Sequence, residues 1–113
     1  MSPITTHVLD TSRGQPAPGV GVTLEIQSAG AWRELSRRTT NGDGRITDLV
    51  SAATQLERGV YRLCFETGAY FRALGIASFY PRISVEFEVR EPAQHHHVPL
   101  LLSPFGYTTY RGS

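Results

Sequence analysis

Alternation of apolar and polar residues is the clearest signal along this chain. In residues 20–27 and 83–90, every second side chain is apolar. A period of two places one set of side chains on the core face of a strand and the other set in water. These stretches therefore predict two amphipathic β-strands. Their apolar positions are Val20, Val22, Leu24 and Ile26 in the first, and Ile83, Val85, Phe87 and Val89 in the second.

Shorter or weaker alternation predicts further strands at residues 4–9, 31–38, 46–49, 60–67 and 95–102. Clusters of Gly, Pro, Asn, Asp and Ser separate these strands. Only residues 68–76 favour a helix, with Tyr70 and Leu74 on one face and Gly75 as the stop signal. The hairpin-like spacing leaves no room for helical crossovers between successive strands. We therefore predict an all-β fold, an antiparallel β-sandwich of two sheets with about seven or eight strands and one short helix.

Length and composition restrict the possible functions. The 113 residues fit a single domain, 1–113, that is long enough to bury one core. The net charge is +1 and the longest basic run is Arg37-Arg38, which argues against a nucleic-acid partner. No stretch approaches the roughly 18 apolar residues of a membrane helix. Residues 1–6 lack the charged and apolar regions of a signal peptide, so we expect a cytoplasmic protein without membrane association.

The single cysteine, Cys64, excludes an internal disulfide bond. A lone cysteine in an apolar strand behaves as a small hydrophobic residue, and we expect Cys64 to be buried.

Three consecutive histidines open the last predicted strand, residues 95–102. The alternating Val and Leu positions of this strand belong to the core, so His95 and His97 share the opposite face and His96 has core parity. Two histidines at this spacing can ligate a metal, flank a substrate or be solvated. If they hold zinc, His7 is a possible third ligand.

Two further stretches are candidates for chemistry. Arg45 directly follows a turn-rich stretch, residues 40–44, and the chain ends in the polar tail Tyr110-Arg111-Gly112-Ser113. Taken singly, Arg45 is a solvent-facing loop residue and the tail is a frayed end. The case for function therefore depends on the set.

Four separated motifs resemble those of the transthyretin-related proteins. They are His7-Val8-Leu9-Asp10 with Gly14-Gln15-Pro16-Ala17; Thr40-Asn41-Gly42-Asp43-Gly44-Arg45; Tyr61-Arg62-Leu63 through Tyr70-Phe71 to Phe79-Tyr80-Pro81; and the stretch from His95 to Pro104, ending in Tyr110-Arg111-Gly112-Ser113. They follow in order from about residue 4 to the last residue. The terminal tetrapeptide is the most specific, because within this family it marks the 5-hydroxyisourate hydrolases and is absent from the hormone-carrying transthyretins. One position departs from the family pattern, since His96 stands where a tyrosine is common.

The resemblance implies a hydrolase that opens a ring amide of 5-hydroxyisourate in urate degradation. The catalytic residues that it implies are His7, Arg45, His97 and Ser113. The substrate-binding residues that it implies are His7, Arg45, Tyr110, Arg111, Gly112 and Ser113. It further implies a homotetramer, a dimer of dimers with sites in a channel between the dimers, and no metal or cofactor.

Ring-amide hydrolysis needs an activated water and stabilisation of an oxyanion. An unperturbed histidine has a pKa of about 6.5, so His7 and His97 suit the proton transfers, one accepting a proton and the other orienting or protonating. The fixed charge of Arg45 suits the oxyanion or an anionic purine. We expect Ser113, with Arg111 and the terminal carboxylate, to position the substrate or the histidines.

Three other functions compete with this interpretation. The first is a transthyretin-like small-ligand binding protein without catalytic activity. The second is a structural or adhesion sandwich of the kind found in larger secreted proteins. The third is a zinc protein that uses His95, His97 and His7.

Overall fold

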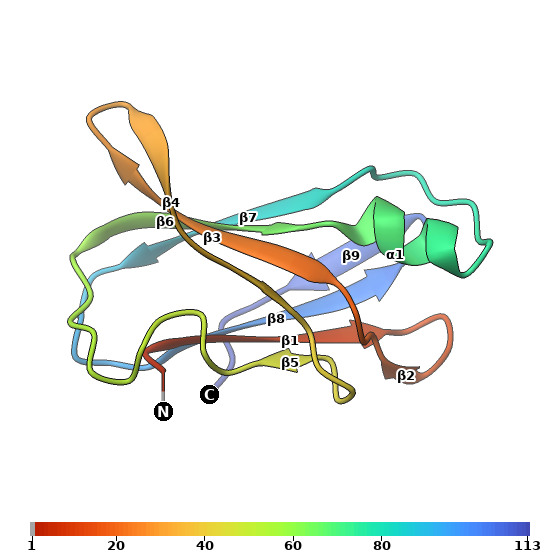
Figure 1. The fold of residues 1–113 in the computed structure, drawn as a ribbon, viewed down its shortest axis with the longest axis horizontal. Coiled ribbons are helices and arrows are strands. Elements are labelled where there is room, and N and C mark those ends of the chain that lie inside the picture. Colours follow the sequence, from red (N-terminus) through yellow and green to blue (C-terminus); the bar gives the residue numbers. More distant parts are fainter. Residues whose placement is uncertain (1) are drawn as a thin grey trace.

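The computed structural model describes residues 2–113, which form nine strands and one short helix (Figure 1). The strands are β1 (Ile4–Asp10), β2 (Gln15–Pro16), β3 (Gly21–Ser28), β4 (Ala31–Thr39), β5 (Arg45–Ile46), β6 (Gly59–Phe65), β7 (Ile83–Val89), β8 (His96–Ser103) and β9 (Gly106–Thr109). The helix is α1 (Thr67–Ala73). The strands predicted from alternation are present except at residues 46–49, where only Ile46 belongs to a strand, the two-residue β5. The strands β2 and β9 were not predicted.

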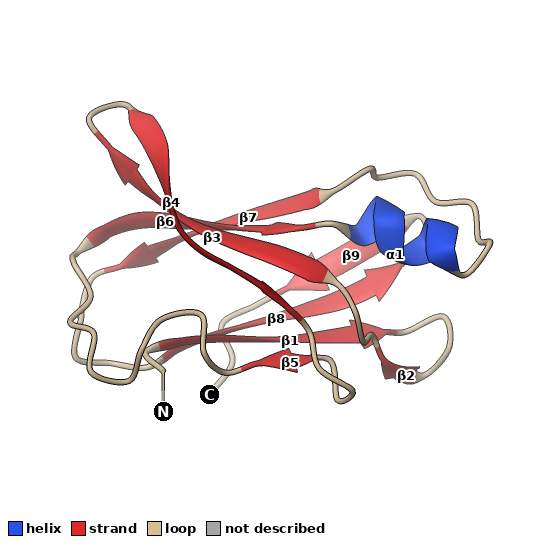
Figure 2. Cartoon of the chain, viewed as in Figure 1, coloured by secondary structure: helices blue, strands red, loops and turns tan. Residues whose placement is uncertain are grey.

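The strands form two sheets that pack face to face, visible as two layers in Figure 2. In one sheet the order is β2-β1-β8-β9, and β5 also pairs with β1. In the other the order is β4-β3-β6-β7. The helix α1 lies at one end of the sandwich (Figure 1). The predicted sandwich with one short helix is therefore confirmed.

The core lies between the sheets and follows the predicted alternation. Leu24 of β3, Leu63 of β6 and Leu100 of β8 are all fully buried. Burying one such side chain stabilises the fold by about 1.5–3 kcal/mol. In β8 the predicted core set of Val98, Leu100 and Leu102 is buried, which leaves the opposite parity of this strand on the outer face of its sheet.

One strand pair departs from the antiparallel rule. β1 and β8 pair in parallel along their length, from Ile4 opposite His96 to Asp10 opposite Leu102. Parallel strands need a long connection, and nearly the whole chain lies between these two. Spacing between successive strands says nothing about such a pair, which is why the sequence did not predict it.

The helix differs in detail from the prediction over residues 68–76. Tyr70 is buried, but Leu74 follows the helix and is 41% exposed, so the predicted shared face was wrong. Gly75 has a φ of +70° and follows directly, as expected of the stop signal.

The prediction of a buried Cys64 was also wrong. Cys64 is partly exposed, because it lies between the core residues Leu63 and Phe65 and so points to the outer face of β6.

A buried carboxylate ties α1 to the end of β1. Asp10 is fully buried, and the Tyr70 hydroxyl donates a hydrogen bond of 2.8 Å to its Oδ2. The backbone N–H and the hydroxyl of Ser12 donate to its Oδ1 at 3.1 and 2.6 Å. Burial and the Asp10 carboxylate raise the pKa of Tyr70, so its hydroxyl stays protonated and remains a donor.

Candidate active site

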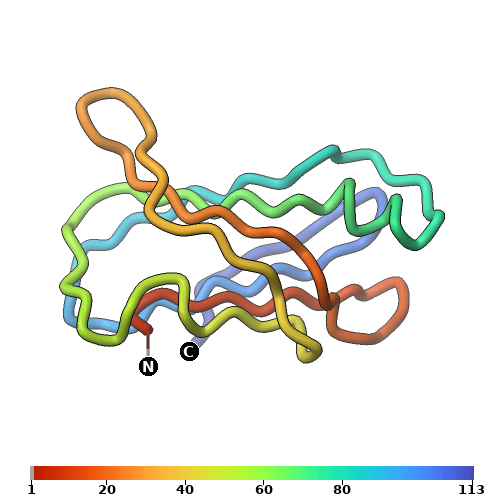
Figure 3. The backbone as a smooth tube through the Cα atoms, viewed as in Figure 1, coloured from red at the N-terminus to blue at the C-terminus, as the bar shows by residue number. Residues whose placement is uncertain are grey.

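The candidate site lies on the outer face of the sheet that contains β1. The parallel β8 places His97 opposite Thr5, and β5, on the other edge of β1, places Arg45 opposite His7. The tube in Figure 3 shows these three segments, red, yellow-green and blue, running together in one layer. Residues that are far apart in the sequence therefore meet on one surface.

A rigid turn presents Arg45. The Asn41 side-chain oxygen accepts hydrogen bonds from the backbone N–H of Asp43 at 2.9 Å and of Arg45 at 3.0 Å. Gly44 has a φ of +74°, and a Cβ at this position would clash with the carbonyl oxygen of Val8. Only glycine therefore lets the turn approach β1 closely enough to set Arg45 beside His7.

A small pocket of about 180 Å³ opens on this surface. Its lining residues are Thr5, Thr6, Arg45, Thr47, His95, His97 and Ser113. Three residues of the predicted site, Arg45, His97 and Ser113, thus share one pocket. Within residues 2–113, the Arg45 guanidinium makes no ion pair, so its charge is available to an anionic group.

His7 does not line this pocket but lies next to Arg45. Its Nε2 is 3.0 Å from the carbonyl oxygen of Asp43. A carbonyl oxygen only accepts hydrogen bonds, so Nε2 of His7 carries the hydrogen and Nδ1 keeps the lone pair of the neutral ring. This contact assigns the tautomer of His7.

Both site histidines have a lowered pKa. For His7 the main cause is burial, followed by the nearby positive charge of Arg45. For His97 burial again comes first, followed by His95, Arg45 and His7. Both rings are therefore neutral at pH 7 and able to accept a proton.

The tail is part of the sheet and not a frayed end. The Gly112 N–H donates a hydrogen bond of 2.8 Å to the His97 carbonyl oxygen, in an antiparallel bridge. A Cβ on Gly112 would lie 2.5 Å from Cδ2 of the His97 ring. The Gly112 backbone therefore packs directly on His97 and carries Ser113 to the pocket.

Tyr110 and Arg111 do not line this pocket but, together with His97, line a neighbouring pocket of about 330 Å³. Tyr110 is 54% exposed, and Arg111 donates hydrogen bonds to Gln94 Oε1 and to the His95 carbonyl oxygen. The structure thus brings Ser113 of the tail, but not Tyr110 or Arg111, into the pocket of one chain. As its parity predicted, His96 faces away from the site and is buried.

Sequence reasoning did not single out the three threonines of the pocket, Thr5, Thr6 and Thr47. The only signal was the parity of Thr5, which it shares with His7. Across residues 2–113, no three His, Cys, Asp or Glu side chains are arranged to hold a metal ion, which leaves the zinc alternative without a ligand set. In the same part of the chain, no helix is long and apolar enough to cross a membrane.

The chain belongs to the HIUase/Transthyretin family, whose family model matches residues 4–112. It is 47% identical over 114 residues to the 5-hydroxyisourate hydrolase of Mus musculus, covering 99% of this chain and 96% of that protein. Among solved structures, the 5-hydroxyisourate hydrolase of Klebsiella pneumoniae matches with a TM-score of 0.84 and 39% identity, over 97% of this chain and 92% of the other. Sea bream transthyretin, solved with thyroxine, matches with a TM-score of 0.91 and 34% identity, over 97% and 94%.

Backbone similarity therefore does not distinguish this hydrolase from this transthyretin, since the transthyretin has the higher TM-score although its sequence is less similar. Side chains at the site have to make that distinction.

Proposed function

We propose that this protein is a 5-hydroxyisourate hydrolase, which opens a ring amide of that purine oxidation product in urate degradation. Family membership and the hydrolase names of its relatives support this function. The observation that carries it is the placement of Arg45, His97 and Ser113 around one pocket, with His7 beside Arg45. A neutral base, a fixed positive charge and a hydroxyl are the groups that amide hydrolysis needs.

In the proposed mechanism, a neutral histidine activates the attacking water. The water oxygen bonds to the ring carbonyl carbon while a histidine accepts the proton, and His97 and His7 both have a free ring nitrogen for this role. The Arg45 guanidinium stabilises the oxyanion. When the carbon–nitrogen bond breaks, the proton taken from the water goes to the leaving nitrogen, either directly from the first histidine or through the second histidine, which otherwise orients the substrate. Ser113 holds the substrate, and the mechanism uses no metal or cofactor.

We further propose that the active form is a homotetramer, a dimer of dimers with its sites in a channel between the dimers. The pocket of one chain, about 180 Å³, is smaller than the roughly 300 Å³ at which ligand pockets begin. A second chain across the pocket would enclose it, and the exposed tail residues Tyr110 and Arg111 would be available to that chain. Light scattering after size exclusion tests this, with four times the chain mass of 12.5 kDa expected.

The direct test is an ultraviolet assay with freshly made substrate. Urate is oxidised by urate oxidase, this protein is added, and the decay of 5-hydroxyisourate is compared with the spontaneous rate. We expect strong acceleration at micromolar protein or less. A decay rate equal to the spontaneous one would refute the proposed function.

Single substitutions then assign the roles. His7→Ala, His97→Ala and Arg45→Ala should each slow turnover by about 100-fold or more, because each removes a proton-transfer group or the oxyanion charge. Circular dichroism should show that the variants remain folded. A near-normal rate for one of them would remove that residue from the mechanism.

Deleting residues 110–113 tests the tail. We expect loss of activity with little loss of stability, because of these residues only Gly112 is tied to the sheet by a backbone bridge. A deletion variant with unchanged activity would show that the tail does not take part in catalysis or substrate binding.

The alternative is a transthyretin-like small-ligand binding protein without activity, which the TM-score of 0.91 to a thyroxine complex favours. This alternative predicts saturable binding of thyroxine and no acceleration of 5-hydroxyisourate decay. The proposed hydrolase predicts the reverse, so the two measurements on one sample separate them.

A further inference from the structure

Thr5 lies between two histidines of the site pocket. Its Oγ1 is 2.8 Å from Nδ1 of His97 and 3.0 Å from Nε2 of His95. The two rings are nearly parallel, with an interplanar angle of 18° and centroids 6.3 Å apart. Thr5 is only 4% exposed, so its hydroxyl has the two ring nitrogens in place of water.

A hydroxyl has a single hydrogen, and this limits the states of both rings. It can donate to one ring nitrogen and accept from the other. If both facing nitrogens carried hydrogens, the hydroxyl hydrogen would be buried without an acceptor; if neither did, one nitrogen would lack a donor. Either state leaves a polar group unsatisfied and is disfavoured. One facing nitrogen therefore carries a hydrogen at a time.

The two permitted states differ in what His97 can do. When its Nδ1 carries the hydrogen, the neutral ring has a lone pair on Nε2, which can accept a proton from water. When His95 is charged, both of its nitrogens carry hydrogens, so the Thr5 hydroxyl turns and donates to Nδ1 of His97. The hydrogen of neutral His97 then sits on Nε2, and that atom is no longer a base.

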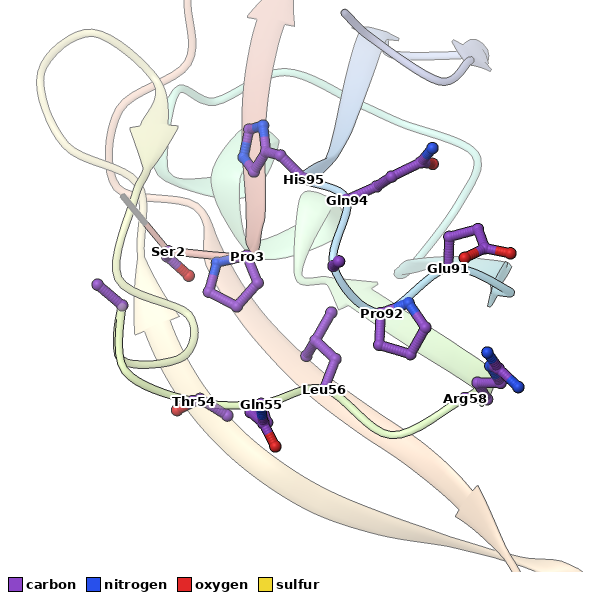
Figure 4. A pocket seen from close by; sticks show the side chains of 12 residues that line it. Ser2, Pro3, Thr54, Gln55, Leu56, Arg58, Glu91, Pro92, Gln94 and His95 are labelled. Carbon is purple, nitrogen blue, oxygen red and sulfur yellow. The ribbon is translucent and has the colours of Figure 1, made fainter.

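His95 is the ring of the pair that meets solvent. It is exposed, whereas His97 is only partly so. His95 also lines a second, wider pocket of about 680 Å³, and Figure 4 shows it on the rim of this pocket, beside Pro3 and Gln94. It therefore exchanges protons with water directly.

We propose that Thr5 is a positioning residue of the site, whose hydroxyl ties the tautomer of His97 to the protonation state of His95. The proposal rests on the hydrolase function proposed above, in which His97 accepts a proton. It assigns Thr5 and His95 a role that acts through His97 and not through contact with the reacting atoms.

Several charged groups around the pair also affect its titration. On the side of His97 they are His7 on β1 and Arg45 on β5. On the side of His95 they are Arg111, which donates to the His95 carbonyl oxygen, and Arg58 and Glu91 across the wider pocket. These groups remain in the variants below. A change in the titration of His97 that occurs only when Thr5 or His95 is replaced is therefore caused by the contact through the Thr5 hydroxyl.

The first experiment reads the tautomers directly and needs no activity. Long-range ¹H–¹⁵N correlation spectra of the histidine rings distinguish a hydrogen on Nδ1 from one on Nε2. In the wild-type protein we expect the hydrogen of neutral His97 to shift towards Nε2 as the pH is lowered, because a charged His95 makes Thr5 donate to Nδ1 of His97. Thr5→Val, which keeps the side-chain shape but removes the hydroxyl, should abolish this shift, and Thr5→Ser should keep it.

Two further variants keep this experiment decisive. His95→Gln changes an exposed residue, is expected to fold, and should also abolish the shift. Thr67→Val is the matched control for loss of a buried threonine hydroxyl, because Thr67 lies in α1 and its Oγ1 is buried without a hydrogen-bond partner among residues 2–113. A His97 tautomer that responds to pH identically in wild type, Thr5→Val and His95→Gln would overturn the proposal.

Kinetics give the second readout. Thr5→Val should lower kcat about tenfold, the equivalent of one lost hydrogen bond, with KM unchanged. Thr5→Ser and Thr67→Val should stay within about twofold of the wild type. In His95→Gln, the acid limb of the kcat/KM profile should move to lower pH.

The two proposals fail separately. If the wild-type protein does not accelerate 5-hydroxyisourate decay, the proposed hydrolase function is refuted. The spectra still test whether the Thr5 hydroxyl couples His95 to His97. If the wild type is active and Thr5→Val has the same kcat and the same pH profile as the wild type, only the proposed role of Thr5 is refuted.

Discussion

Replacing Gly112 with alanine tests how closely the tail and the site histidine are packed. The new Cβ would lie 2.5 Å from Cδ2 and 3.2 Å from Cγ of His97, and 3.2 Å from Cγ of Pro99. Carbon atoms pack at about 3.5–4.0 Å, so the shortest contact has to open by about 1 Å. Pro99 is buried and cannot easily move, so the relief has to come from the His97 ring or from the tail.

Each way of opening the contact costs little stability but disturbs the site. Turning the His97 ring by about 30° costs about 0.5–1.5 kcal/mol and weakens its contact with Thr5. Lifting the tail breaks the hydrogen bond from Gly112 to His97, worth about 1 kcal/mol, and withdraws Ser113. A misplacement of 1 Å at a catalytic group lowers the rate about 100-fold. We therefore expect kcat/KM to fall about 100-fold, with only about 1 kcal/mol lost from the free energy of unfolding.

The assay is the decay of fresh 5-hydroxyisourate, together with urea unfolding of the same samples. Gly106→Ala is the matched control on β9, since its Cβ would be 3.7 Å from Ser103 Oγ, an ordinary contact. Activity of Gly112→Ala within twofold of the wild type would refute the packing argument. A loss of several kcal/mol would show instead that the tail holds the fold together.

Two further predictions concern stability. Tyr70→Phe removes the donor to one oxygen of the buried Asp10 carboxylate, so the free energy of unfolding should fall by about 1.5–3 kcal/mol. Urea unfolding measures this change, and the activity of the folded enzyme should be unchanged. An unaltered urea midpoint would contradict the prediction. Acidification should also destabilise the protein, because burial lowers the pKa of His7, His96 and His97. As the pH falls through about 6.5, the unfolded chain therefore binds protons before the folded protein does. The stabilisation is complete above that pH and is lost below it, so urea unfolding should show a lower free energy at pH 5.5 than at 7.5, and equal values would refute the pKa directions.

Local periodicity predicted many of the strands. The alternation in residues 20–27 and 83–90 located β3 and β7, because a half-buried strand has to alternate whatever its partner is. The same parity argument placed His95 and His97 on one face and His96 on the other. Periodicity failed for β2 and β9, which are too short to show a period, and for the exposed Leu74.

The tertiary structure determined which residues are neighbours at the candidate site. Pairing between strands at opposite ends of the chain leaves no local pattern, so only the folded protein reveals the parallel register of β1 and β8 that sets Thr5 between His95 and His97. The packing of Gly112 on the His97 ring likewise depends on a contact across the sheet. By itself, the sequence supplied candidate residues for chemistry and determined which face of its strand each histidine occupies, since the face follows from the period. Long-range pairing determined their neighbours, because a neighbour on a sheet is set by register and not by position along the chain.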